Sequence, residues 1–159
     1  LYGSKLVAAL DRQHPRDLFD LLGLFEKGRL SQDVVECFVC YLAGHNRPVH
    51  AVLFSRDHDV STAFEREFIG LTRQPITLDQ LVAVRSELRS QLPSELTDNH
   101  RRFLLGLVTG APDWRLMSCA HLAELPAIQW KLQNLLKLKK GNPHKFSKQT
   151  DELRARFCA

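Results

Sequence analysis

The chain has 159 residues, of which 44% are hydrophobic and 25% are charged, and its formal net charge is +4 at pH 7. A chain of this length can bury a core without metal ions, and this composition argues against disorder. Its four cysteines fit reduced thiols better than a disulfide framework. It has no apolar run near the roughly 20 residues of a membrane-spanning helix and no signal-peptide pattern. We therefore expect one cytoplasmic domain over residues 1–159, with no membrane partner.

Apolar residues recur at intervals of three and four along nearly the whole chain, and strict alternation is almost absent. This period is typical of amphipathic helices. We predict an all-α fold, a single bundle of about seven helices. The pattern is already under way at Leu1, so we expect the sequence to begin inside a longer protein.

Capping and helix-breaking residues set the expected helix ends. Ser31, Thr77 and Thr97 have the chemistry of N-terminal caps. Residues 47–54 are ambiguous, and Pro126 breaks or kinks the longest helix. In chain order, the predicted helices cover residues 1–12, 15–28, 31–43, 61–72, 77–93, 97–110, 122–140 and 147–157.

The positive charge is concentrated at the C-terminal end. Residues 131–159 contain eight Lys or Arg against Asp151 and Glu152, a net charge of +6, so the other residues together carry −2. The predicted helices of residues 122–159 are therefore basic. Such a segment either attracts a polyanion such as RNA or is the solvated face of a domain.

Five charged side chains fall on the first two predicted helices, on either side of a proline break: Lys5, Arg12, Arg16, Asp17 and Asp20. Asp17 and Asp20 are three positions apart, so their carboxylates share a helix face and can bind Mg²⁺ or accept a proton from an attacking hydroxyl. Lys5 supplies the positive charge that a phosphoryl-transfer site directs at a triphosphate. The alternative is ordinary helix chemistry, with Arg16 and Asp20 as an i, i+4 pair and Lys5 simply exposed.

Residues 1–20, LYGSKLVAALDRQHPRDLFD, resemble the Lys, Arg and Arg-Asp-x-x-Asp motif region of nucleotidyltransferase toxins of the AbiEii/AbiGii type. Weaker similarity continues through residues 42–48, 103–114 and 125–131. Only the first twenty residues are specific to that family.

The resemblance implies the helical C-terminal half of a bacterial, polymerase-β-like enzyme. It makes Lys5 the nucleotide-contacting lysine and Asp20 a catalytic carboxylate, the base for the acceptor. Asp17 has a supporting catalytic role, and Arg12 and Arg16 join Lys5 in binding the nucleotide. Mg²⁺ and an NTP are the implied cofactors. A tRNA end is the implied acceptor and a cognate antitoxin the partner, in a toxin–antitoxin or abortive-infection system of phage defence.

The sequence departs from this family in one respect, because the metal-binding half of the enzyme is missing. Gly3-Ser4 has no Asp-x-Asp at the required distance, and Asp57-His58-Asp59 has no Gly-Ser before it. We therefore expect the 159-residue chain to transfer no nucleotide by itself.

Cys37, Cys40, His45 and His50 have the spacing of a zinc knuckle that ends in histidine in place of cysteine. Zinc would have to organise a segment that already has a fold of its own. Apolar residues keep a helical period through both cysteines: Val34, Val35, Phe38, Val39 and Leu42. We predict that no metal binds here and that both cysteines are small core residues.

Two further hypotheses do not require catalysis. The chain could be a helical module that binds RNA or a protein through residues 131–156, or a purely structural domain. Trp114 and Trp130 are candidates for stacking on bases, but their helical positions favour burial.

Overall fold

The computed structural model describes residues 2–25, 30–119 and 121–159, which contain helices and connecting segments without a strand. The predicted all-α fold is confirmed for these ranges, although the predicted segments 15–28 and 122–140 each divide into two helices. The α-helices are α1 (Tyr2–Asp11), α2 (Pro15–Phe19), α3 (Leu22–Phe25), α4 (Gln32–Ala43), α5 (Val49–Leu53), α6 (Ser61–Glu67), α7 (Leu78–Glu95), α8 (Asp98–Val108), α9 (Pro126–Gly141) and α10 (Pro143–Phe157). Two short 3-10 helices, η1 (Trp114–Leu116) and η2 (Leu122–Glu124), lie between α8 and α9.

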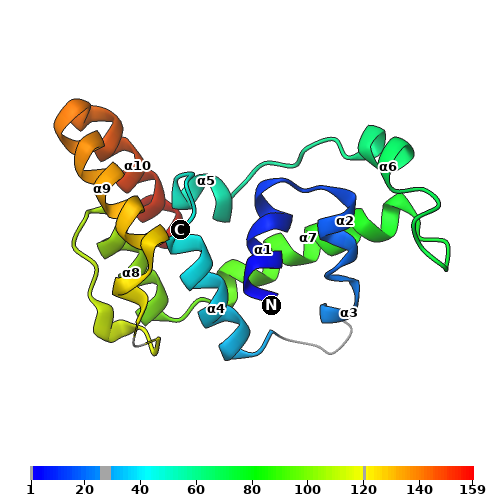
Figure 1. Cartoon of the computed structure of the whole chain (residues 1–159), viewed down its shortest axis with the longest axis horizontal. Coiled ribbons are helices and arrows are strands. Elements are labelled where there is room, and N and C mark those ends of the chain that lie inside the picture. Colours follow the sequence, from blue (N-terminus) through cyan, green and yellow to red (C-terminus); the bar gives the residue numbers. More distant parts are fainter. Residues whose placement is uncertain (1, 26–29, 120) are drawn as a thin grey trace.

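Helix α1 is central to the packing. It lies along α4 and also contacts α2, α5 and α7, and α7 runs through the middle of the molecule (Figure 1). Fully buried side chains include Leu6 and Leu10 of α1, Phe38 and Leu42 of α4, and Leu88 of α7. Each such burial contributes about 1.5–3 kcal/mol. The core therefore fixes α1, which carries the first candidate site residues.

Helices α9 and α10 form a hairpin at one end of the molecule, and α6 lies at the opposite end (Figure 1). The two helices pack together, and α10 also packs on α5 and α8. The Asn142 side chain accepts a hydrogen bond from the backbone N–H of Lys145 at 2.9 Å. This cap starts α10 at Pro143, ahead of the predicted start at Ser147.

Three predicted caps are confirmed. The Ser31 side chain caps α4. Thr77 with Gln80, and Thr97 with His100, form reciprocal capping boxes at the starts of α7 and α8.

The predicted helix of residues 15–28 divides into α2 and α3, and its end at 26–29 lies outside the described residues. The backbone N–H of Leu21 bonds to the carbonyl of Leu18, only three positions back, at 3.1 Å. This tighter turn interrupts the α-helical pattern. It places both leucines in the core, each with 0% exposure.

Prolines act differently from the predictions at two positions. Pro126 starts α9 instead of kinking a longer helix, because a missing N–H costs nothing in a first turn. Helix α7 continues past Pro93, which lies in its last turn. The ambiguous segment at 47–54 contains the short helix α5.

Trp130, which was expected to be buried, is 60% exposed, and Leu71, in the predicted helix of residues 61–72, is 59% exposed. Helix α6 ends at Glu67, before the predicted residue 72, and the chain then turns at Gly70 with a φ of 86°. Leu71 therefore leaves the helix face. Trp130 is excluded from the face of α9 that buries Ile128, Lys131 and Leu135. Trp114 is partly buried and packs on the core.

The packing of α1 on α4 requires a glycine at position 3. A Cβ atom at Gly3 would lie 2.8 Å from the carbonyl carbon of Cys37. We expect Gly3→Ala to lower the free energy of unfolding, measured by urea denaturation, by about 1–3 kcal/mol because the helices must separate. Gly23→Ala is the matched control, since a Cβ at Gly23 meets no atom within 4 Å. Equal effects of the two substitutions would contradict the close contact.

Candidate functional site

One buried residue forms the elbow between α1 and α2. Gln13 is fully buried and has a positive φ of 52°, the left-handed conformation that reverses the chain after α1. Pro15 then begins α2, and His14 Nδ1 accepts a hydrogen bond from the N–H of Arg16 at 3.3 Å. The predicted break between the first two helices is confirmed.

The Gln13 side chain ties three parts of the fold together. Its Nε2 donates to the carbonyl of Arg56 at 2.6 Å and to Ser55 Oγ at 3.3 Å. Its Oε1 accepts from the N–H of His58 at 3.0 Å and from Arg85 Nη1 at 3.3 Å. Thus α1, the segment between α5 and α6, and α7 meet at one amide. Sequence reasoning missed this residue, whose one signal is a polar side chain directly before the predicted break.

The elbow brings two oppositely charged pairs together. Lys5 Nζ on α1 forms an ion pair with Asp20 Oδ2, which directly follows α2. Arg12 Nη2 donates to Asp17 Oδ1 at 2.7 Å. The Lys5 and Asp20 side chains are 31% and 42% exposed, so both are accessible to a ligand. Four of the five predicted site residues therefore lie at one helix junction.

Arg16 is oriented away from that junction. Its Nη2 donates to the carbonyl of Glu67, at the end of α6, at 3.3 Å.

Asp17 has one oxygen without a partner. This atom, Oδ2, is buried and has no hydrogen-bond partner among the described residues. A buried carboxylate oxygen without a donor is unfavourable. Because the atom is buried, a donor from outside would reach it only after its surroundings rearrange.

A groove of about 720 Å³, here called the α1 groove, reaches the junction at Arg12, whereas Lys5, Asp17 and Asp20 do not line it. Ser4, Ala8 and Arg12 form its wall on α1, and Tyr41 of α4 and residues 125–128 at the start of α9 face them. Apolar lining with a few polar groups is typical of ligand sites. Arg12 belongs both to this groove and to the ion pair with Asp17, so the groove meets the junction at this pair.

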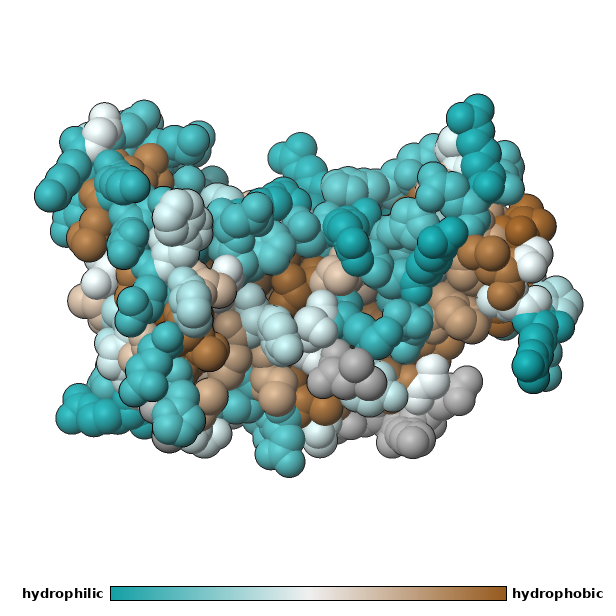
Figure 2. Space-filling view, viewed as in Figure 1, coloured by the Kyte–Doolittle hydropathy of each residue, from teal (hydrophilic) through white to brown (hydrophobic). Residues whose placement is uncertain are grey.

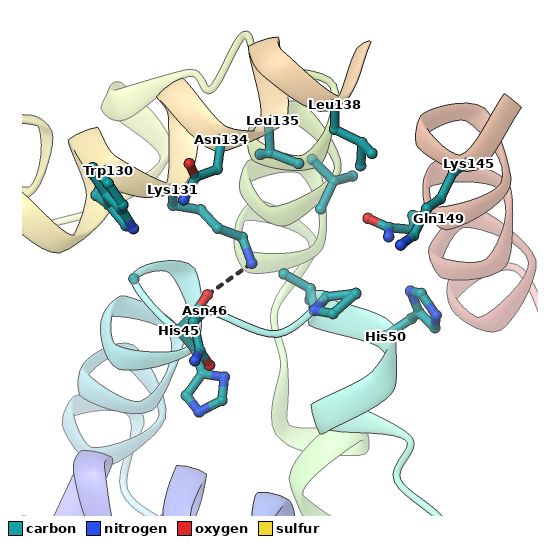
Figure 3. Close-up of a pocket in the computed structure, with 14 residues that line it drawn as sticks. His45, Asn46, His50, Trp130, Lys131, Asn134, Leu135, Leu138, Lys145 and Gln149 are labelled. Atoms are coloured by element: carbon teal, nitrogen blue, oxygen red, sulfur yellow. Dashed lines mark hydrogen bonds between the residues drawn. The ribbon is translucent and has the colours of Figure 1, made fainter. Parts of the chain in front are cut away.

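A second cavity of about 290 Å³, here called the Lys131 cavity, lies between the α9–α10 hairpin and the α4–α5 turn (Figure 3). The buried Lys131 donates to the carbonyls of His45 at 2.8 Å and Arg47 at 2.6 Å. Burial lowers the pKa of Lys131 to about 8. His50 and Lys145 also line this cavity. Lys131 therefore attaches α9 to the turn after α4.

The four residues with zinc-knuckle spacing do not meet at one point. No group of three His, Cys, Asp or Glu able to hold a metal occurs in the described ranges. Helix α4 continues through Cys37 and Cys40, while His45 Nε2 lies 3.4 Å from Asp11 Oδ2 and His50 lines the Lys131 cavity. Burial raises the pKa of Cys40 to about 12, which opposes the thiolate that zinc requires. The expected burial of Cys37 is wrong, because this side chain is exposed beside the buried face of α4.

Paired Lys, Arg and Asp side chains on a helical scaffold, with a groove at Arg12, can bind a charged ligand. The family model described as "Nucleotidyl transferase AbiEii toxin, Type IV TA system" matches residues 1–134. The chain belongs to this AbiEii nucleotidyl transferase toxin family, whose toxin–antitoxin system implies an antitoxin partner. No curated protein and no solved structure matched the chain. No helix in the described part of the chain is long and apolar enough to cross a membrane.

We expect Gln13→Ala to lower the free energy of unfolding by about 1–3 kcal/mol, because it leaves buried donors of His58 and Arg85 without an acceptor. Gln13→Gly removes the same bonds but relieves the positive φ. It should therefore be less destabilising than the alanine variant by about 1 kcal/mol. Chemical denaturation measures both values. Wild-type stability in both variants would show that the amide does not hold the elbow.

Because the pKa of Lys131 is lowered in the folded chain, we expect this residue to increase the free energy of unfolding as the pH becomes alkaline. In the folded chain it loses its proton at about pH 8, whereas its ordinary pKa is 10.5. Between these values the unfolded state binds more protons, so raising the pH favours the folded state. The free energy of unfolding of the wild type should rise relative to that of Lys131→Met from about pH 8 to pH 10.5. Parallel pH curves for the two proteins would contradict this.

Proposed function

We propose that this chain supplies one side of the active site of an AbiEii-type toxin that transfers a nucleotide from an NTP to an acceptor RNA such as tRNA. The observation that carries the proposal is the meeting of Lys5 with Asp20 beside Arg12 with Asp17. These pairs lie in the region matched by the family model. A polymerase-β-like fold for the other half of the enzyme stays a prediction.

The cations and the carboxylates of the two pairs have separate roles in this proposal. Lys5 and Arg12 turn from their carboxylates to the phosphates of the NTP, where their charge stabilises the negative charge of the transition state. Asp20, released from Lys5, takes the proton of the acceptor hydroxyl. The hydroxyl oxygen bonds to the α-phosphate at the same time, and pyrophosphate leaves. Arg16, bonded to the end of α6, has the weakest claim to a nucleotide contact.

Nucleotidyltransferases of this kind generally use an NTP and a divalent metal such as Mg²⁺. Asp17 and Asp20 are too few to hold such an ion by themselves, because Mg²⁺ takes six oxygen ligands. An Asp-x-Asp motif would supply most of the metal shell, and the buried Oδ2 of Asp17 would join it only after its surroundings rearrange. The chain without that motif should therefore bind and orient substrates but not catalyse transfer.

A second candidate function is a non-catalytic helical module that binds RNA or a protein through residues 131–156. The observation that favours it is the excess of lysine on the α9–α10 hairpin. An assay of nucleotide transfer by an intact enzyme that carries this helical half distinguishes the two candidates. Transfer supports the first candidate, and its absence supports the second.

In that intact enzyme, Lys5→Met and Asp20→Asn should each lower nucleotide transfer by roughly 10²- to 10⁴-fold, because each removes a charge that acts in the reaction. Incorporation of labelled NTP into RNA measures the rate, and growth arrest measures toxicity. The matched control is Asp113→Asn with Arg115→Met, an exposed ion pair on another face that should leave both unchanged. Full activity of both site variants would refute the assignment.

The 159-residue chain, mixed with Mg²⁺, NTP and RNA, should incorporate no label. Robust incorporation would contradict the proposal that this half lacks part of the catalytic machinery. Adding a separately expressed Asp-x-Asp half is the positive control.

A further inference from the structure

The α1 groove and the Lys131 cavity are neighbours. Both are lined by Gly44 and His45, at the end of α4. The first turn of α9 lines the groove, and its next turn, with Trp130 and Lys131, lines the cavity. A Cβ atom at Gly44 would lie 3.0 Å from the Cβ of Ala127, so a larger residue would narrow the space between α4 and α9. The two spaces thus follow one another along α9, on either side of the contact between Gly44 and Ala127, and we call the surface that joins them the path. It leads from Arg12 to the hairpin.

Two aromatic side chains on this path are exposed to solvent. Tyr41, in the α1 groove, is 53% exposed, and Trp130, at the Lys131 cavity, is 60% exposed. Both lie among apolar neighbours, yet neither is used by the core. Exposed aromatic rings beside positive charge are the stacking platforms of proteins that bind single-stranded nucleic acid.

The far end of the path is strongly basic. Five exposed lysines occupy the α9–α10 hairpin, and we call them the hairpin lysines: Lys137, Lys139, Lys140, Lys145 and Lys148. None is within ion-pair distance of a carboxylate among the described residues, and Lys145 also lines the Lys131 cavity. Lys137 lies over the Trp130 ring at 5.8 Å. Figure 2 shows this end of the molecule covered mainly by hydrophilic side chains.

The placement of Lys145 gives no benefit to helix stability. The first turn of α10 contains no acidic residue, and a cation there opposes the helix macrodipole. The same arrangement favours an approaching anion, because the helix N-terminus and the lysine attract it together. Asp151 and Glu152 lie further along α10, so the five unpaired lysines form a positive cluster towards the tip of the hairpin. Such a cluster fits the regular phosphates of RNA better than the mixed surface of a protein.

We propose that the acceptor RNA lies with its phosphate backbone on the hairpin lysines, and that its single-stranded 3′ end runs along the path to Arg12 and from there to the α1–α2 junction of Lys5 and Asp20. Bases of that end stack on Trp130 and Tyr41. The 3′ end is the one that must enter, because its ribose carries the free hydroxyls. The proposal rests on the proposed function, since it assigns the acceptor of the same site.

The test is RNA binding by the 159-residue chain, followed by fluorescence anisotropy. Two labelled RNA hairpins of the same stem are compared, one blunt and one with a single-stranded 3′ overhang. Trp130→Ala and Tyr41→Ala should each weaken binding of the overhang RNA by about tenfold or more and leave the blunt RNA nearly unchanged. Trp130→Phe should restore binding, and Leu71→Ala, an exposed apolar truncation elsewhere, should have no effect.

Charge reversal tests the backbone contact. The triple variant Lys139→Glu, Lys140→Glu and Lys148→Glu should weaken the binding of both RNAs. It should also reduce the slope of log K against log salt by about one for each lysine lost. A control with the same change in net charge reverses three exposed arginines elsewhere: Arg66, Arg73 and Arg102.

Three results would overturn the proposal. The first is that the overhang RNA binds the Trp130→Ala and Tyr41→Ala variants as tightly as the wild type. The second is that the lysine and arginine triple variants lose RNA affinity equally. The third is polyglutamate that binds as tightly as RNA and is lost in the hairpin variant, which would assign the surface to an acidic protein. RNA binding by this chain involves no transfer, so the two proposals are tested separately. The binding assay can refute the RNA path while Lys5 and Asp20 remain essential for transfer in the intact enzyme. Conversely, the transfer assay can refute the roles of Lys5 and Asp20 while the RNA path is supported.

Discussion

The geometry of the candidate site depends on the buried amide of Gln13. Lys5 and Asp20 are fifteen positions apart in the chain, and they meet because α2 folds back beside α1 at the elbow. Gln13 adopts a backbone conformation that is unfavourable for a residue with a side chain. Its hydrogen bonds to the segment after α5 and to Arg85 of α7 offset that cost. The elbow is thus held from outside, by parts of the chain distant in sequence.

Lys131 plays a comparable part at the other end of the path. Its ammonium group is buried, which is unfavourable, and two backbone carbonyls at the α4–α5 turn satisfy it. This contact sets the position of α9 relative to α4, and so shapes both the α1 groove and the Lys131 cavity. The same attachment leaves the far end of the hairpin free to carry unpaired lysines. Two buried polar side chains therefore position the two ends of one surface.

Much of the fold could be predicted from the sequence, because local signals decide it. The period of apolar residues gives the helices, and Ser31, Thr77 and Thr97 mark their starts through bonds made within three residues. The proximity of Lys5 to Asp20 could also be expected, since only Gln13-His14-Pro15 separates the two helices. Their roles came from resemblance, not from spacing.

The rest depends on contacts between distant segments, which a single sequence does not display. The division of the second predicted helix goes together with the burial of Leu18 and Leu21 in the core. The exposure of Trp130 follows from which face of α9 is buried, and that face carries Ile128, Lys131 and Leu135. Gln13 carried no distinctive motif, because an amide becomes a structural hub only when its partners surround it.

The central claim is that this helical half presents Lys5 and Asp20 to the reacting groups of a nucleotidyl transfer. A crystal structure of an intact enzyme with this half, bound to Mg²⁺ and a non-hydrolysable NTP, tests it most directly. The account predicts that Lys5 Nζ leaves Asp20 and contacts the triphosphate, with the Asp20 carboxylate facing the position of the acceptor hydroxyl. A nucleotide bound away from the α1–α2 junction, with Lys5 and Asp20 still paired to each other, would contradict it.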